Sequence, residues 1–250
     1  EVDEHQVAKR AQEKAIQYYQ AGRTQNGAMP IIFHGQAMVD LLGAFAPIFS
    51  AERAQKGMSQ LAGKQGQKIA ADCVTIVDTP DHPQLGPGLP FDGEGVPTGV
   101  HTLVDHGVLK TLLYSLSSAK QDGVQSTGHG RRGYSGQVTI APHVFTVQPG
   151  TQTLAELCAQ AGHGVVIYEV SGLHAGVNDV SGDFSLLCKG RLIEHGAEGR
   201  AVEQMVVSGN FFAMLQAITA LGNDTQYSIP GGSCYASPSV YVKELAIAGN

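Results

Sequence analysis

The stretch "DFSLLCKGRLIEHG", residues 183 to 196, combines the pattern of a β-strand with that of a tight turn. Its first half is a short apolar run of the kind that forms β-strands, and the acid-His-Gly order that ends it is typical of a tight turn with glycine at positive φ. The same order recurs in "LVDHG", residues 103 to 107. Because each copy lies between an apolar run and a second β-prone run, both predict antiparallel hairpins.

Further strands are predicted on both sides of this stretch, because residues 72 to 250 consist mostly of short β-branched and apolar segments separated by Gly, Pro and Asp. The segments are "CVTIVD", the loosely bounded 98 to 115, "VTIAPHVFTVQ", "GVVIYEVS" and "VYVKELAIAG". Two helices interrupt them: "TLAELCAQA", with Thr153 as its cap and Glu156 three residues on, and "NFFAMLQAITAL", opened by Asn210.

The first 50 residues have a different pattern. Residues 1 to 22 predict an amphipathic helix, "PIIF" a short buried strand, and "QAMVDLLGAFAPIF" a helix interrupted near Pro47. The fold class is therefore α+β, with mainly antiparallel strands and hairpins and a few packing helices. We expect a single domain over residues 1–250, with 1–29 as a leading helix and loop, and a chain that is a fragment lacking an N-terminal domain.

Composition excludes several classes of protein. The 250 residues are 42% hydrophobic, enough for a sizeable core, and the net charge of −6 without a basic run argues against direct nucleic-acid binding. No apolar run reaches the roughly 18 residues of a membrane helix. The four cysteines are widely scattered, which fits neither a disulfide framework nor a zinc motif and favours a reducing cytoplasm; they are Cys73, Cys158, Cys188 and Cys234.

The loop "STGHGRRGYSG", residues 126 to 136, has the G-x-G-x-x-G spacing of nucleotide-binding loops. It lacks the strand before it, the helix after it and the acidic residue about 20 positions on that this motif needs. Arg131 and Arg132 can still hold a carboxylate or phosphate through forked hydrogen bonds, so a small-ligand or phosphate-binding module remains an alternative.

The sequence contains neither H-E-x-x-H nor G-x-S-x-G, and His106 and His195 are explained by turn chemistry rather than as paired ligands. The densest polar cluster runs from His174 to Ser185 and has two interpretations. It is either a glycine-rich turn whose Asn, Asp and Ser side chains cap their own backbone, or the site of an independently active hydrolase. In "PFDGEGVPT", Asp92 and Glu94 are either solvated or mutually perturbed carboxylates.

Four stretches together resemble one family, the C-terminal domain of the TldD/PmbA proteins, once called modulators of DNA gyrase. The resemblance begins near residue 30, and its motifs occur in the family's order: "GMSQLAGKQGQKIAADCVTIVDTP", "FDGEGVPTGVHTLVDHGVLKTLLYSLSSAKQDGVQSTGHGRR", "GLHAGVNDVSGDFSLLCKGRLIEHG" and "SPSVYVKELAIAGN". It implies a zinc-dependent peptidase, formed by a TldD-type and a PmbA-type (TldE) chain, that trims leader peptides and degrades unfolded ones.

The resemblance also implies where zinc is expected. TldD-type chains carry H-E-x-x-x-H on the helix after a strand like "PIIF", with a cysteine as a further ligand. Here Gly43, Ala44 and Ile48 stand at those positions, and none offers zinc a lone pair. Cys234 lies near the family's late cysteine, but one thiol cannot build the site. The chain therefore resembles the PmbA/TldE type, with no cofactor of its own and zinc expected in a TldD-type partner.

We accordingly expect a cytoplasmic, non-catalytic subunit that positions peptide, either beside a TldD-type subunit or as a homodimer, with an unfolded or leader peptide as substrate and with neither nucleic acid nor membrane as partner. No catalytic residue and no metal ligand is assigned. The candidates for the peptide cleft or the subunit interface are Asp92, Glu94, Thr127, His129, Arg131, Arg132, His174, Asn178 and Asp183.

Overall fold

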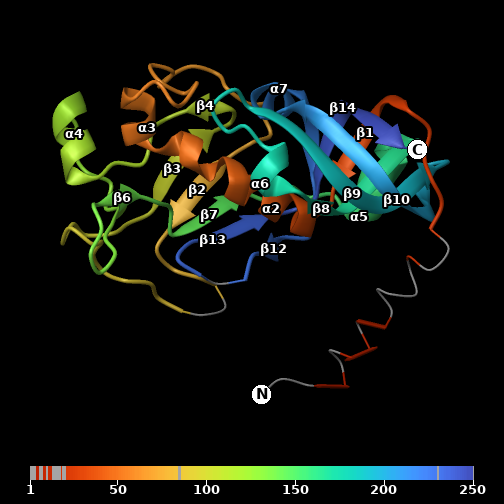
Figure 1. Ribbon diagram of the computed structural model, residues 1–250, viewed down its shortest axis with the longest axis horizontal. Helices are drawn as coiled ribbons and strands as arrows, with labels where there is room; N and C mark the ends of the chain where they lie inside the picture. Colours follow the sequence, from red (N-terminus) through yellow and green to blue (C-terminus); the bar gives the residue numbers. More distant parts are fainter. Residues whose placement is uncertain are drawn as a thin grey trace.

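The computed structural model describes residues 4, 5, 8, 9, 11, 12, 18, 21–83, 86–229 and 231–249 (Figure 1). The predicted helix over residues 1 to 22 lies largely outside these residues. Among them, no helix is both long and apolar enough to cross a membrane. The described chain is a mixture of helices and strands, as predicted.

Five strands of the first sheet close on themselves. The order is β1-β8-β9-β10-β14, and β14 pairs back with β1, from Gly27 opposite Ile247 to Phe33 opposite Val240. A sixth strand, β11, continues from β14. A closed sheet has no free edge among its five strands. The interior of so small a barrel can be filled by the side chains that point inward. The bounds are β1 Gly27–Phe33, β8 Gly164–Ser171, β9 Asp183–Glu194, β10 Ala197–Asn210, β11 Ile218–Leu221 and β14 Val240–Gly249.

The second sheet is open and lies beside this barrel along the long axis of the molecule (Figure 1). Its order is β12-β13-β7-β2-β3-β4, and a two-stranded hairpin, β5-β6, is separate from both sheets. The bounds are β2 Ile76–Thr79, β3 His101–Asp105, β4 Val108–Leu109, β5 Gly130–Arg131, β6 Thr139–Ile140, β7 Val144–Val147, β12 Gln226–Tyr227 and β13 Cys234–Ser237.

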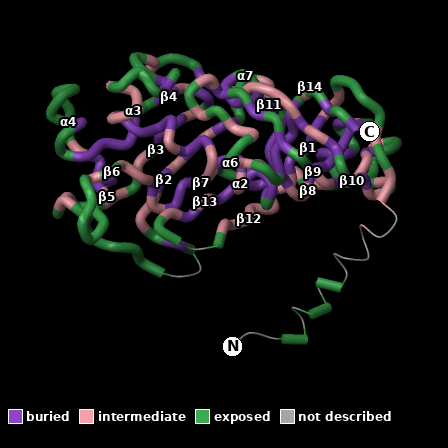
Figure 2. Tube along the Cα trace, in the orientation of Figure 1, coloured by how far each residue is buried: buried purple, intermediate pink, exposed green. Residues whose placement is uncertain are grey.

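Helix α2, Gly35–Phe45, connects the two sheets because it packs against β8 of the first and β13 of the second. It ends where the sequence predicts, since Pro47 follows within a 3-10 turn over Ala46–Phe49. The buried residues form a continuous band along the centre of the molecule (Figure 2). The remaining helices are α3 Ala51–Gln55, α4 Leu116–Asp122, α5 Leu154–Ala161, α6 Leu173–Gly176 and α7 Phe211–Ala217.

Both predicted hairpins are present. "LVDHG" connects β3 to β4 and "LIEHG" connects β9 to β10, and the histidine of each turn shares the positive φ of its glycine: 46° at His106 and 53° at His195. Two consecutive positive φ values are those of a type I′ turn, which matches the twist of a hairpin. The sequence predicted a positive φ at the glycine of each turn but not at the histidine before it.

Three features of the fold differ from the sequence-based expectation. The helix opened by Asn210 is shorter than predicted, because Ile218–Leu221 pairs with β14 as a strand. Strand β10 was not predicted as a separate element; its polar first half is held by β9 through a bulged register, with Gln204 at φ 55°. Finally, β1 pairs with β8, and β7 with β13, in parallel.

The capping box of α5 gives a first testable prediction. Thr153 Oγ1 accepts from the Glu156 amide at 3.3 Å, and Glu156 Oε2 accepts from the Thr153 amide at 2.7 Å. Thr153→Ala removes the cap and is expected to lower the free energy of unfolding by about 1 kcal/mol in urea denaturation. Thr153→Ser keeps the hydroxyl and should retain most of the stability; equal losses in both variants would contradict a capping role.

Candidate functional site

A cavity of about 510 Å³ opens beside α2. Because α2 packs against both sheets, the cavity lies at the junction between them. Its walls come from three segments that are far apart in the sequence, within residues 39–44, 173–179 and 228–235. The lining residues are Val39, Asp40, Gly43, Ala44, Leu173, His174, Val177, Asp179, Ser228 and Tyr235.

The amphipathic pattern of α2 determines which residues it presents to this cavity. The helix begins after His34, whose Nδ1 accepts from the Gln36 amide, and it buries Leu41, Leu42 and Phe45 in the core. Its other face carries one carboxylate, that of Asp40. The residues that follow it on this face, Gly43 and Ala44, have little or no side chain. Burial, with a further contribution from Glu169, raises the pKa of Asp40.

The opposite wall of the cavity is formed by the segment around α6. His174 is exposed there, and the Asp179 carboxylate accepts from the Arg53 guanidinium at 2.6 Å. This ion pair ties the wall to α3 and neutralises Asp179. Apart from the Tyr235 phenol, the ionisable side chains that line the cavity without an ion pair among the described residues are therefore Asp40 and His174.

The residues on α2 do not fit a zinc ion. Gly43 and Ala44 line the cavity without offering a ligand atom, and Ile48 is fully buried in the core rather than facing it. Cys234 is buried, with its sulfur near Ser228. Among the described residues, the one group of three potential ligands within reach of a single ion lies elsewhere, at Asp78, His129 and His143.

The polar cluster from His174 to Ser185 has the hydrogen bonds of a turn. Asn178 Oδ1 accepts from the amides of Val180 and Ser181 at 3.1 Å each, and Asp183 accepts from Ser181 Oγ at 2.8 Å. Hydrogen bonds from Asn210 and Ser181 lower the pKa of Asp183. In the described chain no hydrogen bond joins His174 to a serine of this cluster. The arrangement therefore gives no support to an independent hydrolase.

Asp92 and Glu94 are bound to backbone amides rather than to each other. The Asp92 side chain is buried; Oδ1 accepts from the amides of Glu94 and Val96 at 2.9 Å, and Oδ2 from Gly130 at 2.7 Å. Glu94 Oε2 accepts from the Leu116 amide at 2.8 Å. Asp92 thus fixes the "FDGEG" loop against the 126–136 loop and is not solvated, while Glu94 binds the same loop to the start of α4.

The 126–136 loop lacks the geometry of a nucleotide-binding loop, as the sequence indicates. It contains the short strand β5, and the next element along the chain is the strand β6 and not a helix. Gly128 has φ 72°, and a Cβ there would lie 2.5 Å from the Pro97 carbonyl oxygen, so this glycine permits a close approach of two chain segments. Arg131 donates to the Pro142 carbonyl at 3.2 Å, while Arg132 is exposed.

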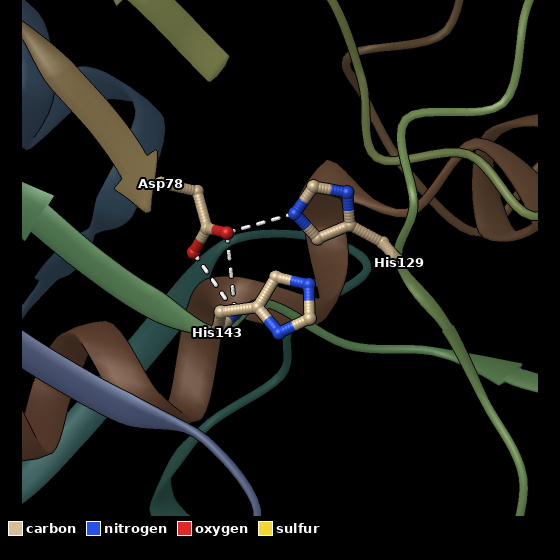
Figure 3. A group of neighbouring side chains, drawn as sticks. All are labelled: Asp78, His129 and His143. Carbon is tan, nitrogen blue, oxygen red and sulfur yellow. Dashed lines mark hydrogen bonds and ion pairs between the residues drawn. The ribbon is translucent and has the colours of Figure 1, made fainter. Parts of the chain in front are cut away.

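Within this loop, Thr127 and His129 belong to a buried cluster centred on Asp78. His129 Nε2 lies 2.7 Å from Asp78 Oδ2, and its Nδ1 lies 2.8 Å from Thr127 Oγ1. The His143 amide donates to both oxygens of the same carboxylate at 3.0 and 3.2 Å. Figure 3 shows the side chains of Asp78 and His129 turned toward each other, and the Asp78 carboxylate joined to the main chain of His143. Both Thr127 and His129 lie below the surface and apart from the α2 cavity.

Two further contacts surround this cluster. The imidazole ring of His101 lies 5.3 Å from that of His129, and burial together with the neighbouring His129 lowers the pKa of His101. The ring of His143 lies 4.8 Å from that of His129, and its Nε2 is 2.9 Å from the Gly128 carbonyl oxygen. The cluster thus combines one carboxylate with three imidazoles.

Asp78 and His143 were not predicted from the sequence as partners of His129. The three positions are far apart in the chain, so no spacing motif connects them. One local signal was available, because Asp78 follows Ile76 by two positions and so lies on the same buried face of β2. An aspartate is rarely buried without a partner, so an acid on the core face of a predicted strand indicates a polar cluster.

Comparison with known proteins gives the family. Residues 26–249 match the model of the PmbA/TldA metallopeptidase C-terminal domain. A Thermotoga maritima protein described as a modulator of DNA gyrase has a solved structure that superposes with a TM-score of 0.91 at 38% identity, over 99% of this chain and 56% of that one. The solved structure of TldE from Thermococcus kodakarensis superposes with a TM-score of 0.87 at 28% identity, over 98% of this chain and 55% of that one.

A curated relative is similar at the sequence level. The metalloprotease PmbA homolog of Haemophilus influenzae is 27% identical over 245 residues, which are 98% of this chain and 51% of the relative. The chain therefore spans about half the length of the curated relatives it matches. Since the family match covers nearly the whole described chain, this protein belongs to the PmbA/TldD metallopeptidase family, of which it carries the C-terminal domain.

Proposed function

We propose that this chain is the peptide-positioning subunit of a TldD/TldE-type peptidase, in which a TldD-type partner holds the catalytic zinc. The observation that carries the proposal is the cavity beside α2, which is open and large enough for side chains of a peptide but has Gly43 and Ala44 where a metal-binding helix needs ligands. The similarity to TldE and to TldD homologs supports a partnership of the TldD/TldE type.

Two properties of the cavity suit an unfolded peptide. Val39, Leu173 and Val177 offer apolar contacts, and Asp40 offers a negative group beside them. In addition, Ser228 on the cavity wall directly follows β12, which is the end strand of the second sheet. A peptide that adds to such an edge binds through main-chain hydrogen bonds, and this mode tolerates many sequences.

The test combines this chain with a TldD-type partner and measures bound zinc and cleavage of an unstructured peptide. We expect cleavage by the pair, loss of cleavage with a chelator, and no cleavage by either chain alone. Peptide cleavage by this chain alone that persists in chelator would overturn the proposal and restore the independent hydrolase.

A variant that fills the cavity tests the positioning role directly. Ala44→Leu puts three more carbon atoms into the cavity and is expected to lower kcat/KM of the pair about 10-fold, which corresponds to about 1.4 kcal/mol of lost transition-state binding. The matched control is Ala213→Leu, at an exposed alanine of α7. An unchanged kcat/KM in Ala44→Leu, with the zinc content of the pair intact, would contradict peptide binding in this cavity.

A further inference from the structure

We propose that Asp78, His129 and His143 form a binding site for a divalent transition metal, separate from the α2 cavity and independent of the peptide-positioning role. One potential ligand atom from each residue lies within 4.8 Å of the others. Two imidazoles and one carboxylate form a ligand set that suits ions such as Zn²⁺, Co²⁺ and Fe²⁺.

The ligands come from three parts of the chain that the fold holds in place. Asp78 lies on β2, His129 precedes β5, and His143 precedes β7, which pairs with β2 from Thr79 opposite Val144. The side chains of Asp78 and His129 are both fully buried. Donors held by a rigid sheet reduce the cost of ordering a site when the ion binds.

The hydrogen bonds of Thr127 indicate how His129 is oriented. Thr127 Oγ1 accepts from the Tyr114 amide at 2.7 Å and lies 3.3 Å from the Tyr114 carbonyl oxygen, to which its single proton can be donated. In that arrangement Nδ1 of His129 is the donor to Thr127, and a neutral ring then turns the lone pair of Nε2 toward Asp78. Two lone pairs at 2.7 Å repel each other unless a cation lies between them.

A proton or a metal ion can be that cation. When the metal binds, it replaces the proton on Nε2, which is released to solvent, while the proton on Nδ1 remains hydrogen-bonded to Thr127 Oγ1; the imidazole is then neutral and Nε2 is a ligand. Metal-bound histidines usually have such a partner on their second nitrogen. His143 also has one, because its Nε2 contacts the Gly128 carbonyl oxygen at 2.9 Å.

Only small movements are needed to form the site. A tetrahedral ion with bonds near 2.1 Å separates its ligand atoms by about 3.4 Å, so the Asp78–His129 contact opens and the longer separations close. Access is available, since His143 lines a second cavity of about 220 Å³ together with Arg131, Ser233 and Cys234. The Arg131 guanidinium in this cavity donates to the Pro142 carbonyl. Its positive charge repels an entering cation, and the negative charge of the Asp78 carboxylate offsets that repulsion.

The experiment uses the purified chain without a partner, stripped of metal and then titrated with Zn²⁺ and Co²⁺. We expect one equivalent of metal by elemental analysis, a visible Co²⁺ absorption, and a rise in Tm of about 5–10 °C at a metal concentration 100 times the Kd. His143→Gln and His129→Gln should weaken the affinity more than about 100-fold, because each removes one of three ligands.

The control is His174→Gln, which removes an exposed imidazole from the other cavity and should leave metal affinity unchanged. If His129→Gln does not fold, His143→Gln decides, since this side chain is only partly buried. Absence of bound metal and of any Tm shift in the unaltered chain would overturn the proposal and support the expectation of a chain without a cofactor. Unchanged affinity in folded His143→Gln would overturn it as well.

Discussion

Phe45→Ala is expected to lower the free energy of unfolding by about 3–5 kcal/mol, because it removes a fully buried aromatic ring at the centre of the core. The Phe45 ring stacks on that of Phe211 with centroids 4.2 Å apart and planes 11° apart, and it meets the edge of Phe184 at 6.3 Å. Phe184 lies on β9 of the first sheet and Phe211 begins α7, while Phe45 ends α2. Truncation therefore opens a cavity where the helix joins the barrel.

Thermal unfolding followed by circular dichroism measures this effect, and we expect Tm to fall by roughly 6–20 °C. Phe91→Ala is the matched control, because Phe91 is 57% exposed and its truncation leaves no buried cavity. Phe45→Leu keeps most of the volume but loses the stacked ring, so its stability should lie between the two. Equal Tm values for Phe45→Ala and Phe91→Ala would contradict the role assigned to the aromatic cluster.

Asp78→Ala should also be strongly destabilising, by about 3–5 kcal/mol, because it removes one partner of a buried pair. It leaves His129 Nε2 and the His143 amide without the acceptor they contact at 2.7 and 3.0 Å. Unfolding in urea, with a chelator present, measures the hydrogen-bond network without any contribution from metal. Asp78→Asn retains an acceptor oxygen and should lose less.

Asp105→Ala provides a matched comparison, since Asp105 also pairs with a histidine at 2.8 Å but at the surface. Solvent screens that pair, so its removal should hardly change the urea midpoint. His106 and Lys110 lower the pKa of Asp105, so the small contribution that exists is present at neutral pH and is lost as pH falls through that lowered value. A loss as large as that of Asp78→Ala would show that burial does not decide the strength of these pairs.

Local patterns were sufficient to predict much of the fold. The turns at His106 and His195, the cap at Thr153 and the end of α2 before Pro47 each depend on residues within a few positions. Pairings between distant segments could not be predicted in the same way. Residues 218–221 continue a helical pattern, yet they form a strand because β14 offers them backbone partners.

The same distinction applies to the candidate sites. His129 and His174 were selected from the sequence, but the sequence contains no information on which distant groups they meet. One is buried beside Asp78 and the other lines the α2 cavity. Gly43 and Ala44 could be assigned to the zinc position only through the family resemblance, and the burial of Ile48 emerges only from the packing of the turn after α2.

The pairing of β1 with β14 has a consequence for how the chain folds. Gly27 meets Ile247, so the barrel cannot close until nearly all of the described chain has left the ribosome. Contacts between such distant segments carry a large loop-closure cost and slow folding. Until then the apolar face of β1 lacks its neighbour, and a nascent chain in this state is prone to association. We therefore expect barrel closure to be a late step in folding.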